Sequence, residues 1–147
     1  MTKDAMKIIQ DAIQAVDPYK VIQSNIVRDN NILNFKKENL TFDLSKDYEE
    51  IVVVAFGKAS SAMSTSILQQ VFPKDCDDIG ISCKGVVICK DGHVTDYEKE
   101  ILTHHCVEIF EASHPVPDHR SVEAADRLIQ IVSSAASERT LVICCIS

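Results

Sequence analysis

The N-terminal third of the chain combines helical periodicity with short apolar segments. From residue 3 to 16, apolar side chains recur every three or four positions, which predicts one amphipathic helix. Asp17-Pro18 is a typical helix start, so a second, short helix is expected in a segment that ends at Asn30-Asn31. Short apolar segments flank the polar residues 36–39, which predicts a small hairpin. Residues 1–48 are therefore expected to form a helical and hairpin lead-in.

From residue 49 onwards, apolar runs alternate with segments of helical spacing. The runs are rich in Val and Ile, as is typical of strands buried on both faces of a parallel sheet. Helical spacing follows the first run and precedes the last, whereas only a short connection is expected after the turn at Asp91-Gly92. Residues 49–147 therefore predict βα units in a three-layer α/β/α fold with a mostly parallel sheet that is truncated after its last strand. The four expected strands are 51–56, 85–89, 107–112 and 140–146.

Composition narrows the class of protein. The 147 residues are enough for one domain, and a net charge of -7 disfavours binding to nucleic acid or to an anionic membrane. No apolar run approaches the roughly 20 residues that span a bilayer, and no signal peptide is recognisable, so a cytoplasmic protein is expected. Six cysteines without a CxxC pair predict reduced, buried thiols, and no His or Cys spacing indicates a metal site.

The first candidate for chemistry is the sequence Gly57-Lys58-Ala59-Ser60, between an expected buried strand and the first turn of a helix. Backbone N–H groups at such a position bind phosphate or carboxylate, and a lysine there opposes the helix dipole unless an anion lies nearby. The sequence matches neither the Walker A pattern nor GxGxxG. The alternative is a solvated lysine whose methylene stem covers apolar surface.

The second candidate is the loop Ser113-His114-Pro115-Val116-Pro117-Asp118, after the third expected strand. Two prolines restrict this loop, so it could present His114 and Asp118 in a fixed arrangement. A rigid turn in which Asp118 caps the next helix explains the same residues.

Together, these segments resemble the glycerate 2-kinase family. The similarity lies in 51–59, 85–88, 111–118 and 140–147, in that order along the chain. The resemblance implies phosphoryl transfer from ATP to D-glycerate, giving 2-phosphoglycerate, usually with Mg²⁺. It also implies a Rossmann-like N-terminal domain that faces a second domain across the active site. This chain, 1–147, corresponds to the first part of that N-terminal domain, so the C-terminal domain is expected to be absent and the chain alone is expected to be inactive.

The resemblance also assigns residues. Lys58 matches the family's active-site lysine and is expected to neutralise charge on phosphate or glycerate oxygens. His114 and Asp118 are expected to shape the site, and Ser147 matches the first residue of a Gly-Gly-Gly-Ser turn whose remainder is missing here. No residue is assigned to a metal. The expected substrate- and nucleotide-binding residues are Gly57, Lys58, Ser60, His114, Asp118 and Ser147.

Two other hypotheses stay open. A noncatalytic sugar-phosphate-binding domain of sugar-isomerase type would use the serines Ser60, Ser61 and Ser64 after the first strand. A structural or dimerising domain would leave Lys58 as a surface residue. In each case the truncated sheet could support self-association.

Overall fold

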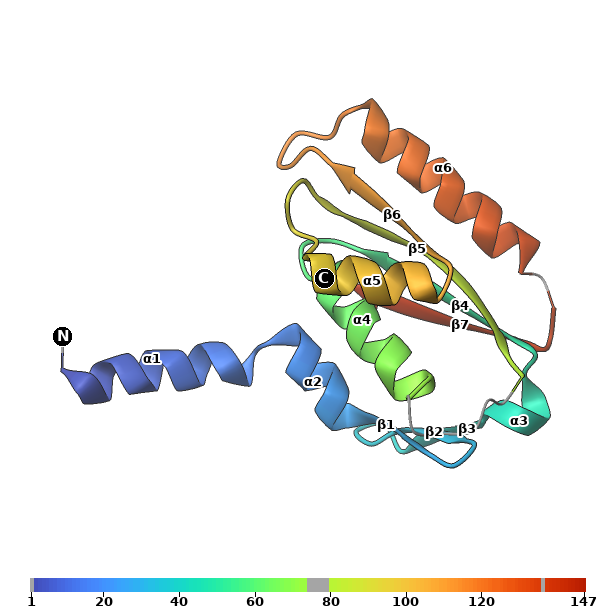
Figure 1. Cartoon of the computed structure of the whole chain (residues 1–147), viewed down its shortest axis with the longest axis horizontal. Coiled ribbons are helices and arrows are strands. Elements are labelled where there is room, and N and C mark those ends of the chain that lie inside the picture. Colours follow the sequence, from blue (N-terminus) through green and yellow to red (C-terminus); the bar gives the residue numbers. More distant parts are fainter. Residues whose placement is uncertain (1, 74–79, 136) are drawn as a thin grey trace.

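A four-stranded parallel sheet forms the centre of the computed structural model, which describes residues 2–73, 80–135 and 137–147 (Figure 1). Its spatial order is β6-β5-β4-β7, and every neighbouring pair is parallel. Val53 lies opposite Gly85 on one side and Ile143 on the other, so β4 is an inner strand. The strands are β4 (Glu50–Phe56), β5 (Ser82–Lys90), β6 (Val107–Ala112) and β7 (Thr140–Ile146).

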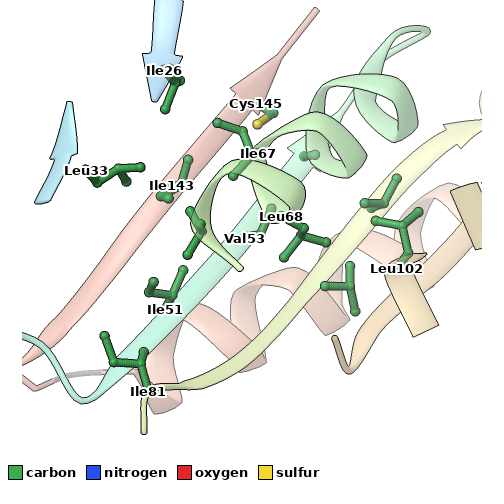
Figure 2. Close-up of a cluster of buried hydrophobic side chains, with 14 of the residues drawn as sticks. Ile26, Leu33, Ile51, Val53, Ile67, Leu68, Ile81, Leu102, Ile143 and Cys145 are labelled. Atoms are coloured by element: carbon green, nitrogen blue, oxygen red, sulfur yellow. The ribbon is translucent and has the colours of Figure 1, made fainter. Parts of the chain in front are cut away.

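Helices cover both faces of this sheet and create two separate apolar cores. On one face, Ile67 and Leu68 of α4 (Ser60–Val71) and Leu102 of α5 (Asp96–His104) belong to the larger core, part of which is drawn in Figure 2. On the other face, Ile131 of α6 (His119–Ser134) packs in a smaller core with Val52 and other residues of β4 and β5. The alternation of side chains along each strand assigns odd and even positions of β4 to opposite cores. The expected three-layer α/β/α fold with a parallel sheet is thus confirmed.

The lead-in contains the expected hairpin and a further strand. The antiparallel sheet has the order β1-β2-β3, and its strands are β1 (Ile26–Asp29), β2 (Ile32–Phe35) and β3 (Leu40–Asp43). We expected the segment of the second helix to continue to Asn30-Asn31. This was wrong, because that helix ends at Asn25 and β1 follows it directly. Ile26 and its neighbours pair with β2 instead, and Asn30 takes a positive φ of 52° in the connecting turn. β-branched residues such as Ile26 favour this pleated arrangement.

Three helices complete the lead-in: α1 (Lys3–Ala15), α2 (Pro18–Asn25) and α3 (Leu44–Asp47). The carboxylate of Asp17 accepts a hydrogen bond from the backbone N–H of Lys20, so Asp17 caps α2 as expected. Tyr19 ties α2 to α4, since its carbonyl accepts a hydrogen bond from Ser66 at 2.9 Å. By contrast, α1 extends away from the remainder of the structure and has no buried residue (Figure 1).

Helix α5 was not expected, because a short connection was predicted between β5 and β6. Among the nine residues of α5, only Leu102 is buried, so its apolar periodicity is too short to recognise. Its start is defined instead by a capping box, in which Thr95 and Glu98 satisfy each other's backbone N–H groups. Within the described residues, no helix has the length and apolar character needed to cross a membrane.

Candidate functional site

The carboxyl ends of β4, β5 and β6 border an open pocket of about 310 Å³. In open α/β sheets, ligands bind at this edge, where the loops that follow the strands come together. Five of the lining residues come from the end of β5 and the turn after β4, and the other five come from the end of β6, the loop and helix that follow it, and residue 147. The pocket is lined by Gly57, Lys58, Ile88, Cys89, Lys90, Ala112, Ser113, His114, Ser121 and Ser147.

The turn after β4 is held in place by backbone contacts with residue 147. The Gly57 N–H donates to the Ile88 carbonyl at 3.1 Å, and the Ser147 N–H donates to the Phe56 carbonyl at 3.2 Å. Gly57 has a φ of +113°, and a Cβ at this position would come within 2.2 Å of the Ser147 carbonyl oxygen. Glycine is therefore required here both by the backbone conformation and by the close approach of another backbone segment.

The hydroxyl groups of Ser147 and Ser60 also form hydrogen bonds with the backbone of this turn. The Ser147 hydroxyl oxygen accepts a hydrogen bond at 2.9 Å from the N–H of Ala59, the N-cap residue of α4. Ser60 is fully buried, and its hydroxyl donates toward the carbonyl oxygens of Gly57 at 2.8 Å and Ile88 at 3.0 Å. Ser60 thus stabilises the turn through these backbone carbonyls and does not line the pocket.

The loop after β6 divides its residues between the pocket and the start of α6. His114 is exposed and lines the pocket, and its peptide bond to Pro115 is cis. Asp118 instead is the N-cap of α6: its carboxylate accepts from the Arg120 N–H at 3.1 Å, and its own N–H donates to the Ser121 hydroxyl at 3.4 Å. Asp118 is absent from the pocket lining and holds the loop in position.

Arg120 connects the loops after β5 and β6. Its guanidinium donates two hydrogen bonds of 2.7 Å to the two carboxylate oxygens of Asp91 and further bonds of 2.9 and 2.7 Å to Asp118. It also donates to the Glu111 carbonyl at 3.2 Å. Hydrogen bonds from Arg120 lower the pKa of both Asp91 and Asp118, so both carboxylates stay ionised and paired at neutral pH.

Two lysines supply positive charge to the pocket. Lys58 is exposed and Lys90 is half-buried, and both are lining residues. Within the part of the chain that the structure describes, no carboxylate forms an ion pair with either ammonium group. The neighbouring thiol is not a nucleophile at neutral pH, because burial raises the pKa of Cys89 to about 11.

The structure brings together four of the six residues expected at the site, namely Gly57, Lys58, His114 and Ser147. Ser60 and Asp118 lie just outside the pocket, in structural hydrogen bonds. Sequence reasoning missed Lys90, although its place at the end of a parallel strand that neighbours the strand before Lys58 was a usable signal. Among the described residues, no group of three His, Cys, Asp or Glu side chains could hold a metal ion.

Comparison with known families gives one match that covers nearly the whole chain. The family described as Domain of unknown function (DUF4147) matches residues 4–147. No solved structure matches the chain.

Curated relatives carry two kinds of name. The chain is 29% identical over 131 residues to a glycerate 2-kinase of Pyrococcus horikoshii. The aligned region is 88% of the chain and 25% of the relative. It is 26% identical over 145 residues to a D-glycerate 2-kinase of Thermotoga maritima, and this aligned region is 96% of the chain and 27% of the relative. It is also 35% identical over 91 residues to a putative hydroxypyruvate reductase of Agrobacterium vitis, and this aligned region is 62% of the chain and 18% of the relative. The chain therefore spans about a quarter of the length of these kinases, or less for the reductase.

Proposed function

Because the chain belongs to the DUF4147 family, the N-terminal domain of glycerate 2-kinases and hydroxypyruvate reductases, we propose that it forms one side of an active site for phosphorylation of D-glycerate by ATP. The product would be 2-phosphoglycerate. The observation that carries the proposal is the position of Lys58, in a pocket at the carboxyl edge of the sheet beside the start of α4.

In this proposal, Lys58 neutralises charge that develops on phosphoryl oxygens. Phosphoryl transfer depends mainly on positioning and on electrostatic stabilisation, so a cation aimed at the transferring group is the contribution that this edge of the sheet can make. Gly57 and Ser147 set the start of α4, and His114 borders the substrate. ATP would bring Mg²⁺ on its phosphates, and we assign no ligand of that ion to the described residues.

We favour a kinase over a reductase because of the turn after β4. Binding of a nicotinamide dinucleotide at this edge typically uses the glycine pattern GxGxxG, whereas the turn here has Gly57 followed by Lys58 and Ala59. Ala59 stands where that pattern has its second glycine, which lets the backbone approach a pyrophosphate, and Lys58 before it supplies a cation for an anionic oxygen.

The serines on which the sugar-isomerase hypothesis depends are not accessible to a ligand in this structure. Ser60, Ser61 and Ser64 are at most 2% exposed, so their hydroxyls lie within the protein and not in the pocket. Ser60 donates to backbone carbonyls, and Ser61 donates to Glu98 at 3.3 Å. A sugar phosphate could not reach these groups without unpacking α4.

The test is an ATP-dependent phosphorylation assay with D-glycerate. It should be run on this chain and on a chimera in which the chain replaces the matched quarter of the Thermotoga maritima D-glycerate 2-kinase. We expect no turnover by the chain alone, because an open half-site cannot hold two substrates in line, and measurable turnover by the chimera. In the chimera, Lys58→Met should lower kcat by about two orders of magnitude or more, as removal of a transition-state donor does.

A matched control is Lys37→Met, which removes an exposed lysine from the turn between β2 and β3. It should leave kcat within twofold of the unsubstituted chimera. A folded chimera with full activity after Lys58→Met would contradict the proposed role. NADH-dependent reduction of hydroxypyruvate by the chimera, without phosphorylation of D-glycerate, would favour the reductase instead.

A further inference from the structure

We propose that Lys58 and Lys90 act as a pair and bind one doubly charged phosphate group in the pocket between the ends of β4 and β5. This inference rests on the proposed function and deepens it, because it names the anion and adds a second binding residue. Three features support it: the positions of the two lysines at the same end of neighbouring strands, the pairing of the nearby acids, and the size of the pocket.

The two lysines lie at the same end of neighbouring parallel strands. β4 ends at Phe56, opposite Ile88 of β5, and Lys58 lies in the turn two residues beyond it, whereas Lys90 is the last residue of β5. Because the two strands are parallel, both of these ends lie at the carboxyl edge of the sheet. Both lysines line the same pocket, and two cations that converge on one pocket repel each other unless an anion lies between them.

The acidic side chains near the pocket are already satisfied. Arg120 holds the carboxylates of Asp91 and Asp118, and the backbone N–H of Gly92 donates to the Glu111 carboxylate at 2.7 Å. Each of these acids therefore has a partner other than a lysine. The pocket lining itself contains both lysines and no Asp or Glu side chain, so a bound anion meets positive charge there.

The size and remaining lining of the pocket fit a small phosphate ester. A volume of about 310 Å³ is roughly ten times the ~30 Å³ that one water molecule occupies in the liquid, so a phosphate group would leave room for a few more heavy atoms. Ser113, Ser121 and His114 lie in the same lining and can donate or accept hydrogen bonds. A carboxylate could contact both lysines but would leave one positive charge uncompensated, whereas a dianion balances both, so the pair favours a doubly charged phosphate.

The experiment is a titration of the ¹⁵N-labelled chain with inorganic phosphate at pH 8 and constant ionic strength, followed by NMR chemical shifts. We expect saturable shifts at Gly57, Lys90 and Ser113, and an increase in Kd of about tenfold or more in both Lys58→Met and Lys90→Met, because hydrogen bonds to charged groups are lost. The control Lys37→Met removes the same charge far from the pocket and should change Kd by less than twofold. Parallel titrations with 2-phosphoglycerate, ATP and D-glycerate show whether the phosphate comes from the product or the nucleotide, and D-glycerate should bind the most weakly.

The outcomes separate this inference from the proposed function. An unchanged Kd in Lys90→Met, with a raised Kd in Lys58→Met, would overturn the paired site and leave the role of Lys58 intact. Absence of saturable shifts in the unsubstituted chain, or equal weakening by Lys37→Met, would also overturn it, since the first means no site and the second a general charge effect. The phosphorylation assay on the chimera decides the proposed function independently of both results.

Discussion

Arg120 shows how a single residue determines which charges near the pocket are available. It pairs with the carboxylates of Asp91 and Asp118, and it thereby joins the loop after β5 to the start of α6. These pairs are on the surface, with the Arg120 side chain 40% exposed, so their main effect is on geometry and local charge and not on overall stability. Arg120 is therefore a positioning residue of the site.

Gly57 is a residue at which both the backbone conformation and a close contact oppose substitution. We predict that Gly57→Ala lowers the free energy of unfolding by several kcal/mol, because the positive φ alone costs about 1–2 kcal/mol and the new Cβ would also meet the Ser147 backbone at 2.2 Å. Relief of that clash requires the end of β7 to move away from β4, which breaks the hydrogen bond between Ser147 and Phe56. Urea denaturation followed by circular dichroism measures the change.

Gly92→Ala is the matched control for this prediction. Gly92 also has a positive φ, of +71°, but no atom lies within 4 Å of the position that its Cβ would take. Its substitution should therefore cost only the conformational part, about 1–2 kcal/mol. Equal losses in the two variants would show that the contact with residue 147 contributes nothing.

The sequence predicts the residues of this site unevenly, for physical reasons. Gly57, Lys58 and His114 follow strands directly, so the position of the strands already assigns them to one edge of the sheet. The cap that Asp118 gives to α6 is local, and it was one of the two interpretations of that loop. The hydrogen bond from Ser60 to the Ile88 carbonyl, and the pairing of Arg120 with Asp91, depend instead on distances between segments that are far apart in sequence. No local pattern encodes such distances.

At the scale of elements, buried strands were easier to predict than half-exposed helices. The inner strands β4 and β5 carry continuous Val and Ile runs, since both of their faces are covered. Helix α5 packs only a narrow stripe against the sheet and α4, so its sequence is mostly polar. Its capping box was the signal that periodicity could not provide.

The capping box of α5 gives a prediction at this scale. Thr95→Ala removes the hydroxyl that accepts the Glu98 N–H at 3.2 Å and contacts the Glu98 carboxylate at 2.9 Å. We expect a loss of about 1 kcal/mol in the free energy of unfolding, measured by urea denaturation. Thr103→Ala, at an exposed position of the same helix, is the control and should be neutral or slightly stabilising, because Ala has the higher helix propensity. A larger loss in Thr103→Ala than in Thr95→Ala would contradict the role of the cap.

At the scale of the whole molecule, the two faces of the sheet are covered unequally. Helix α6 packs on β4, β5 and β6, and the residues of β7 on that same face remain open: Val142 is 38% and Ile146 is 62% exposed. Val142 lies opposite Val52, which α6 covers completely, so the boundary of the covered area runs between β4 and β7. Among the described strands, β7 pairs only with β4, so its outer edge presents free N–H and carbonyl groups. An apolar face next to a free strand edge favours association with another chain.

We therefore predict that the chain self-associates through β7 in solution. Light scattering after gel filtration, over a range of protein concentrations, should give a mass that rises above the 16.3 kDa of one chain. Ile146→Lys introduces a charge at the exposed face of β7 and should return the mass to that of the monomer, because burial of an unpaired ammonium opposes association. Val116→Lys, which changes a residue that is 72% exposed in the loop after β6, is the control and should leave association unchanged. A monomeric mass for the unsubstituted chain at every concentration, or equal loss of association in the two variants, would show that β7 is not the surface at which copies of the chain meet.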